Sequence, residues 1–203
     1  MPGKRATPEI RKNQIIAAAD LVLLEVGIDA FTIDQVIAKA GIAKGTVYNY
    51  YKNKDQILAE LGVKAIKLMY EYFERHIGQH AHSVDKIKAL CLACYQFNKH
   101  YPQYFELISY MERPEFDINT TGYLKLSQGL QRFTERLIQE GQARQELRPN
   151  LDAATTHYII WACCVGVVEF VDTKKRLLAN HHEIDQEQMV KTFAEILTVG
   201  MAI

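Results

Sequence analysis

The sequence predicts an all-α protein, and three observations carry this prediction. Residues that favour helix starts recur along the chain, and apolar residues between them recur every three or four positions. No stretch alternates apolar and polar residues with a period of two, as a half-buried strand does. The chain has 203 residues, 48% hydrophobic and 24% charged. This composition is ordinary for a soluble globular protein, and the length suffices to bury a core without disulfides.

The first helix is expected from Pro8 to Val26. Thr7 is a good N-cap residue, and proline is well tolerated in the first helical turn. Apolar residues then repeat at helical spacing from Ile15 onward until Gly27 ends the pattern.

Two short helices follow, at 33–40 and 44–51. Thr32 and Gln35 have the spacing of a capping box at the start of the first one. Its apolar face comprises Ile33, Val36, Ile37 and Ala40. The connection, residues 40–43, is short and contains Gly41. Two short helices joined in this way are typical of a helix-turn-helix motif.

The remaining helices are longer and more apolar. They are expected at 54–77, 84–99, 102–112, 121–143, 153–173 and 186–200, with Ser83, Asp152 and Asp185 as N-caps of the second, fifth and sixth. Loose segments are expected at 78–83, 113–120, 146–151 and 179–184. None is long enough to be a flexible linker, so the long helix at 54–77 is expected to join the two parts of the chain rigidly.

Charge is unevenly distributed along the chain. The 24 basic and 24 acidic residues cancel overall, which by itself points away from a nucleic-acid partner. Residues 1–54, however, carry eight basic and five acidic side chains, a net charge of +3, which leaves −3 for the rest. A modestly basic end on an acidic body fits a small DNA-reading domain.

The second helix of the motif has the side chains that base recognition needs. Lysine can reach guanine or phosphate, threonine can contact thymine, asparagine can bond adenine, and glycine permits close approach. The residues expected on this surface are Lys44, Gly45, Thr46, Tyr48, Asn49 and Tyr50. Thr32 and Lys54 lie at helix N-termini, where phosphate oxygens are favoured. Thr32 can also serve as a helix cap alone, and Val47 and Tyr51 are expected to pack inward.

Residues 8–60 resemble the N-terminal domain of the tetracycline-repressor family. The resemblance rests on the opening helix, on Phe31-Thr32, and on Val36, Ala38, Ala40, Gly41 and Ile42. It continues with Lys44-Gly45-Thr46-Val47-Tyr48-Asn49-Tyr50-Tyr51 and Lys52-Asn53-Lys54-Asp55-Gln56-Ile57-Leu58. Family proteins contact DNA from the positions matched here by Thr32, Lys44, Thr46, Tyr48, Asn49, Tyr50 and Lys54. Three positions depart from the family pattern: Ala43 replaces a frequent serine and cannot cap a helix, Tyr50 replaces histidine, and Tyr51 replaces phenylalanine.

The resemblance implies that the two parts of the chain have different functions. Residues 1–54 would form a three-helix DNA-binding domain, and residues 55–203 an all-helical ligand-binding and dimerisation domain. The implied function is a homodimeric transcriptional regulator, most simply a repressor, that binds a palindromic operator and is released by a small-molecule inducer. The motif does not encode the sign of regulation, so an activator stays open.

The C-terminal part offers two further expectations. Its aromatic residues, several with polar tips, can line a pocket for an apolar or aromatic ligand, including a cationic one. The same residues can instead simply form the core. The candidate pocket residues are Tyr95, Tyr104, Phe105, Tyr110, Met111, Tyr123, Phe133, His157 and Trp161. The last two helices are apolar enough to form a two-fold dimer interface, or to be buried within one subunit.

The four cysteines favour a reducing compartment. The start of the chain lacks an apolar segment after its basic residues, and the longest apolar run, from Tyr158 to Val168, is too short to span a bilayer. A cytoplasmic protein without membrane contact is therefore expected. Cys91 and Cys94 share a helix face and could bind metal with nearby histidines, act as a thiol switch or pack as small apolar residues. Cys163 and Cys164 are expected to pack.

No catalytic motif is recognisable in the sequence, and no cofactor or metal is predicted. The chain lacks a glycine-rich phosphate loop, a GxSxG nucleophile turn and an HExxH zinc motif. We therefore expect a regulator that is not an enzyme. Two alternatives stay open, an all-α enzyme and a protein-interaction adaptor that keeps the fold without DNA binding.

Overall fold

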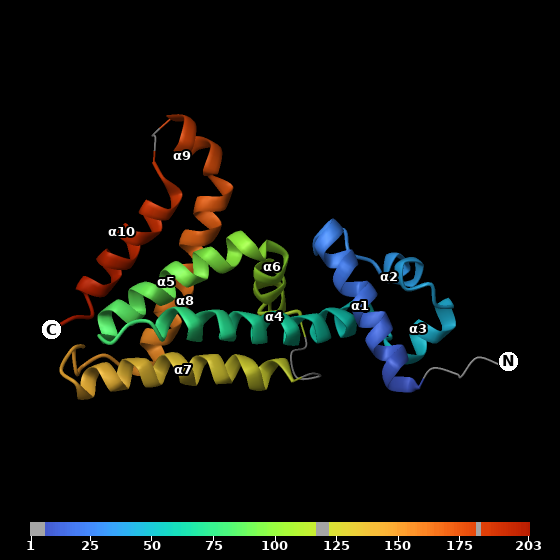
Figure 1. Ribbon diagram of the computed structural model, residues 1–203, viewed down its shortest axis with the longest axis horizontal. Coiled ribbons are helices and arrows are strands. Elements are labelled where there is room, and N and C mark those ends of the chain that lie inside the picture. Colours follow the sequence, from blue (N-terminus) through green and yellow to red (C-terminus); the bar gives the residue numbers. More distant parts are fainter. Residues whose placement is uncertain (1–6, 117–121, 182–183) are drawn as a thin grey trace. The chain divides into compact units, whose positions relative to one another are not determined.

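The structure, a computed structural model, describes residues 7–116, 122–181 and 184–203, and within these ranges it is helical with no β-strand. Figure 1 labels its helices. They are α1 (Pro8–Val26), α2 (Ile33–Ala40), α3 (Lys44–Tyr50), α4 (Lys54–Ile77), α5 (Ser83–His100), α6 (Pro102–Met111), α7 (Tyr123–Ala143), α8 (Ala153–Thr173), α9 (Lys175–His181) and α10 (Gln186–Val199). The predicted all-α fold is confirmed.

The chain forms two compact units. Unit 1 contains residues 1–67 and 103–126, and unit 2 contains residues 68–102 and 127–203. The helices α4 and α7 therefore each contribute to both units, and α6 belongs with the N-terminal helices. The division into functional domains at residue 54 stays a prediction, but the compact N-terminal body is larger than that division implies.

Helix α1 is the central element of unit 1. The Thr7 side chain accepts a hydrogen bond from the backbone N–H of Ile10 at 3.3 Å, which confirms Thr7 as N-cap. Gly27 ends the helix with φ of 73°, a value that favours glycine. Helix α1 packs against α2 and buries Ile15 and Leu23 completely. These two apolar residues stabilise the small bundle by burial.

Helix α6 is fastened to the rest of unit 1 by packing and by a polar cluster. Met111 fits over Gly62 of α4, where a Cβ atom would lie 1.9 Å from the Met111 sulfur. Asp20 of α1 accepts hydrogen bonds from the Tyr104 hydroxyl (2.6 Å) and from Lys64 (2.5 Å). Burial lowers the pKa of Lys64, but its hydrogen bonds to Asp20 and Tyr104 outweigh burial, so the pKa is raised. Asp20 thus links α1, α4 and α6.

Unit 2 is built around α5, which packs against α8 and α10 (Figure 1). Its core includes Ile87, Phe97, Ile160, Val190 and Ala194, all nearly inaccessible to solvent. The predicted caps of α8 and α10 are confirmed. Asp152 accepts a hydrogen bond from Thr155 N–H at 2.8 Å, and Asp185 accepts one from Gln188 N–H at 2.7 Å.

The predicted cap of α5 is wrong by one residue. The N-cap is His82, whose ring nitrogen accepts a hydrogen bond from the N–H of Val84 at 3.3 Å. Ser83 is instead buried, and its N–H donates to the Glu146 carboxylate at 2.7 Å. The hydrogen bonds from Ser83 lower the pKa of Glu146. Because Ser83 contacts Glu146, 63 residues further along the chain, it does not cap the helix.

Helix α9 overlaps a segment that was predicted to be loose. Residues 179–181 belong to this short helix, which Leu178 anchors by burial. The other predicted ends agree with the structure to within two residues. The expected helix start at Thr121, residues 117–120 of one loose segment, His182 with residue 183, and the basic residues Lys4 and Arg5 lie outside the described residues.

We predict that Asp20→Asn lowers the free energy of unfolding by about 1–3 kcal/mol, because the largely buried Asp20 loses its charge-assisted hydrogen bonds with Lys64 and Tyr104. Glu25→Gln is the matched control, since the Glu25–Lys39 pair is exposed on the surface at 2.6 Å. It should cost about 0.5 kcal/mol or less. Urea denaturation followed by circular dichroism measures both, and equal losses would contradict a structural role for Asp20.

Candidate nucleic-acid interface

Helices α2 and α3 form the predicted helix-turn-helix. The capping box is present: Thr32 N–H donates to the Gln35 side chain at 2.8 Å, and Gln35 N–H donates to the Thr32 hydroxyl at 3.3 Å. Gly41 ends α2 in the left-handed conformation, with φ of 63°, and its N–H donates to the carbonyl of Ile37 at 3.1 Å. Glycine is favoured there because a side chain would strain this conformation. Ile42 is buried and fixes the turn.

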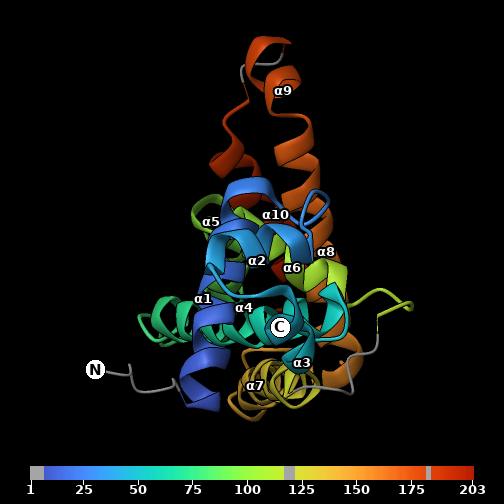
Figure 2. The same cartoon turned by 90° about the vertical axis from the view of Figure 1, so that its right-hand side faces the viewer.

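Helix α3 has one inner and one outer face. Val47 and Tyr51 are buried, with 0% and 3% of their surfaces exposed, as predicted. The predicted contact residues lie outside this buried face. Lys44, Gly45 and Asn49 are exposed, and Thr46, Tyr48 and Tyr50 are half-buried. Figure 2 shows α2 and α3 together with α1. The inner residues therefore hold α3 in place while six predicted contact residues remain accessible.

The N-terminus of α3 has no side-chain cap, as Ala43 predicted. Lys44 forms an ion pair with Asp34 of α2 at 3.0 Å, and its ammonium lies 5.8 Å from the centre of the Tyr48 ring. The hydrogen bond to Asp34 raises the pKa of Lys44. Both partners are well exposed, so the pair is weak and Lys44 can exchange Asp34 for a phosphate.

The start of α4 carries a reciprocal cap that the sequence interpretation did not identify. Asn53 accepts a hydrogen bond from the Gln56 N–H at 3.0 Å, and the Gln56 side chain accepts one from the Lys52 N–H at 2.8 Å. The spacing of Asn53 and Gln56 is the signal that could have revealed it. This cap orders the turn that presents Lys54, whose ammonium lies 5.9 Å from the Tyr110 ring centre on α6.

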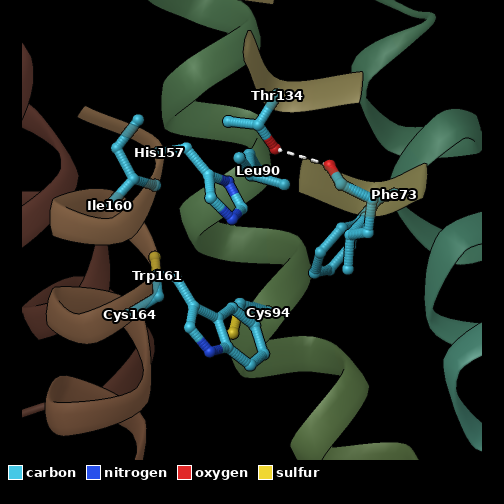
Figure 3. A pocket seen from close by; sticks show the side chains of 9 residues that line it. Phe73, Leu90, Cys94, Thr134, His157, Ile160, Trp161 and Cys164 are labelled. Carbon is cyan, nitrogen blue, oxygen red and sulfur yellow. Dashed lines mark hydrogen bonds between the residues drawn. The ribbon is translucent and has the colours of Figure 1, made fainter. Parts of the chain in front are cut away.

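The structure does not bring the predicted pocket residues into one site. Tyr104, Phe105, Tyr110, Met111 and Tyr123 belong to unit 1, whereas Tyr95, Phe133, His157 and Trp161 belong to unit 2. Of these nine, His157 and Trp161 line a cavity in unit 2, shown in Figure 3. The sequence interpretation missed its other lining residues, Phe73, Leu90, Cys94, Leu130, Thr134, Ile160 and Cys164. Apolar residues at helical spacing do not reveal which side of a core is hollow.

Tyr95 and Phe133 occupy other positions in unit 2. The Tyr95 hydroxyl donates to the side chain of Gln186 at 3.4 Å. The Phe133 ring packs edge-on against Tyr70, with 5.3 Å between ring centres. Neither side chain lines the cavity. Their aromatic rings contribute packing between helices of unit 2.

The cysteines are packing residues in this structure. Cys91, Cys94 and Cys164 are buried and Cys163 is half-buried. A hydrogen bond with Cys164, together with burial, raises the pKa of Cys91 far above its usual range. A protonated thiol is a poor nucleophile and a poor metal ligand. Within the described ranges, no three or more histidine, cysteine or acidic residues form a metal-binding group.

The last long helices expose large apolar side chains. On α8 these are Tyr158, Ile159 and Phe170, with 47–58% of their surfaces exposed, and on α10 they are Ile196 and Val199, with 71% and 73% exposed. Ala162 and Gly166 of α8 are also exposed. Among the described residues, one helical stretch, Ala153–Asn180, is long and apolar enough to cross a membrane by length and composition. It exceeds the apolar run considered above, but core helices of soluble proteins pass the same test.

The helix-turn-helix with its accessible α3 face defines a DNA-binding protein of the helix-turn-helix class. Comparison with known proteins then shows which family this part of the chain resembles. Residues 15–61 match the sequence profile of the bacterial regulatory proteins of the tetR family. Residues 15–61 are therefore similar to the N-terminal domain of a family of DNA-binding transcriptional regulators.

Relatives of known name extend over most of the chain. The HTH-type transcriptional repressor KstR2 of Mycolicibacterium smegmatis is 20% identical over 166 residues, 78% of each chain. The fatty acid metabolism regulator protein of Bacillus subtilis is 22% identical over 194 residues, 93% of this chain and 94% of its own length. The structure also resembles the transcriptional regulator FadR of Bacillus subtilis in complex with stearoyl-CoA. In that comparison the TM-score is 0.71 at 20% identity, over 93% of this chain and 98% of the other.

We predict that Tyr51→Phe leaves unit 1 equally stable or more stable by up to about 1 kcal/mol. The Tyr51 hydroxyl is buried and has no hydrogen-bond partner among the described residues, and burial together with Glu60 raises its pKa. Tyr50→Phe is the control for the same chemical change on the half-buried neighbour. Thermal denaturation of both variants measures the change in stability. A loss of more than 1 kcal/mol in Tyr51→Phe would show that the hydroxyl has a stabilising partner.

We also predict that Gly45→Ala stabilises the free protein by about 0.5–1 kcal/mol and weakens operator binding about tenfold or more. A Cβ at Gly45 meets no atom within 4 Å, so the free protein accepts it. On DNA, the same methyl group would separate α3 from the duplex. Gly129→Ala on α7, also unobstructed, is the control that gains stability alone. Unchanged operator affinity in Gly45→Ala would place the backbone of α3 away from the groove.

Proposed function

We propose that the protein is a homodimeric, ligand-responsive repressor that binds a palindromic operator. The observation that supports this most directly is the outer face of α3, where lysine, threonine, asparagine and tyrosine side chains are accessible on a firmly packed helix. In this proposal α3 enters the major groove, and two α3 helices of a dimer occupy successive grooves about 34–36 Å apart.

The DNA contacts divide into two kinds. Lys44, Gly45, Thr46, Tyr48, Asn49 and Tyr50 face the groove and its edges, where base recognition occurs. Thr32 and Lys54 lie at the starts of α2 and α4, where backbone N–H groups and the helix dipole favour phosphate. Thr32 serves both as helix cap and as phosphate contact, since its hydroxyl is exposed beside the capping box.

The dimer interface is proposed on α8 and α10. Their outer faces expose Tyr158, Ile159, Phe170, Ile196 and Val199, which soluble monomers rarely leave uncovered together. The small residues Ala162 and Gly166 let a partner helix approach closely, and no atom lies within 4 Å of a Cβ placed at Gly166. A self-complementary helix pair about a two-fold axis covers both faces. Covering by a second copy also explains an apolar α8 in a cytoplasmic protein without membrane contact.

The ligand is proposed to be small and apolar or aromatic, and to bind in the cavity of unit 2. The relative FadR of Bacillus subtilis supports this class, since its structure is a complex with stearoyl-CoA. The cavity itself is lined almost wholly by apolar and aromatic side chains. The protein acts by binding rather than by catalysis, as the names of its relatives indicate.

Ligand and operator are coupled through the chain. The ligand releases the operator only if it binds the DNA-incompetent conformation more tightly than the DNA-bound one. Helix α4 carries both Lys54 and the cavity residue Phe73, so it is a direct connection between the two sites. We propose that ligand binding shifts α4 and thereby changes the separation of the two α3 helices.

The experiment that tests this function selects bound duplexes from a random pool and then compares variants on the selected operator. Lys54→Ala should weaken binding to all duplexes and reduce the salt slope by about one unit, because one phosphate contact is lost. Thr46→Ala should change preference at particular base pairs by about 1–3 kcal/mol. Lys67→Ala, an exposed lysine further along α4, should change neither. Fluorescence anisotropy at several salt concentrations measures all three.

Two results would contradict the proposal. If Lys54→Ala and Thr46→Ala weaken every duplex equally, the groove-facing surface lies elsewhere. If the purified protein retains no duplex at low ionic strength, the chain is an adaptor that keeps the fold without DNA binding.

A further inference from the structure

The chemical character of the cavity in unit 2 restricts the class of ligand that it can bind. Its walls come from four helices: Phe73 from α4, Leu90 and Cys94 from α5, Leu130 and Thr134 from α7, and His157, Ile160, Trp161 and Cys164 from α8. Figure 3 shows the rings of His157 and Trp161 projecting from α8 toward α5. Among these lining residues, none is lysine, arginine, aspartate or glutamate.

The polar groups of the wall offer little to a charged ligand. The Thr134 hydroxyl already donates to the carbonyl of Leu130 at 3.3 Å. Burial lowers the pKa of His157, and the nearby Glu135 only partly opposes this, so the ring is neutral at physiological pH. Glu135 is itself engaged by the side chain of Gln131 at 2.8 Å. A charged group in this cavity would lose its hydration without gaining a charged partner, at a cost of several kcal/mol.

We propose that the cavity selects an uncharged apolar molecule, an aromatic ring or a short alkyl chain, with any single polar group turned toward His157. Carboxylate, phosphate and ammonium groups are excluded from it. The inference rests on the proposed function, because it specifies which class of molecule acts as the ligand. If an acyl thioester such as stearoyl-CoA bound here, its anionic part would have to stay outside the cavity.

The dimensions of the cavity add a second requirement. The cavity volume is only about 20 Å³. That is room for about one water molecule. A larger ligand must therefore push apart the side chains of α4, α5, α7 and α8. The occupied and empty states of unit 2 differ in helix packing, as a ligand that shifts a conformational equilibrium requires.

Trp161 makes the test direct, because it is the only tryptophan of the chain. The full-length protein is titrated at pH 8 with 1-octanol, octanoate and octylammonium, three probes of equal chain length and different charge. We expect 1-octanol to change the Trp161 emission saturably, and the two charged probes to bind at least tenfold more weakly. Octanoate or octylammonium binding as tightly as 1-octanol would overturn the inference and leave operator binding untouched.

Two cysteine variants on α5 test whether 1-octanol binds in the cavity. Cys94 lines the cavity, whereas Cys91 is buried on the same helix and is not among the lining residues. Cys94→Leu fills the cavity and should weaken 1-octanol binding at least tenfold, and Cys91→Leu should change it less than threefold. Circular dichroism verifies folding. Should Cys94→Leu fail to fold, Cys164→Ala, which enlarges the same wall, should strengthen 1-octanol binding instead. Equal effects of the lining and non-lining variants would place the probe elsewhere and overturn the inference.

The same preparation separates this inference from the proposed function. Operator retention at low ionic strength tests DNA binding and does not depend on the cavity. Operator release by 1-octanol, but not by octanoate, would support both together. Retained operator binding with equal affinity for all three probes would reject the uncharged ligand class alone.

Discussion

The burial of Val47 and Tyr51 is the constraint on which the proposed DNA-reading surface depends. Val47 of α3 and Tyr51, which directly follows the helix, fix the rotation of α3 about its own axis. The directions in which the other side chains of α3 point follow from this rotation. Because α3 has only seven residues, its own hydrogen bonds could not hold it in place. Gly41 and the Thr32–Gln35 capping box set where α2 ends and begins, so that the turn delivers α3 to this packing site. The accessible lysine, threonine and asparagine side chains are a consequence of what is buried beneath them.

Unit 1 shows how a small reading domain is extended by a helix from later in the chain. Asp20 joins α1, α4 and α6 through hydrogen bonds to Lys64 and Tyr104, and Gly62 lets Met111 of α6 pack against α4. The consequence is a compact N-terminal body larger than the helix-turn-helix alone. Helices α4 and α7 continue through both units, so the movement that we propose on ligand binding would act through them.

The cavity that we propose as the ligand site is defined by its chemistry as well as by its volume. Its walls are apolar, its histidine is neutral, and its one hydroxyl is satisfied by a backbone carbonyl. Such a site recognises the absence of charge, because burying an ion without a partner costs far more than apolar contact returns. The exposed apolar residues of α8 and α10 are unfavourable in water, and this supports the proposed dimer interface.

Local signals in the sequence determined most of the helices and the helix-turn-helix. Caps such as Thr7, Asp152 and Asp185, the glycine after α2, and the inward positions of Val47 and Tyr51 depend on residues a few positions apart, which a linear pattern displays. The tertiary structure alone decided which residues form the cavity, that α6 belongs with α1, and that Ser83 is buried against Glu146 rather than capping α5. These outcomes depend on pairs of residues far apart in the chain. Periodicity shows which face of a helix is apolar, but not which neighbour that face will meet.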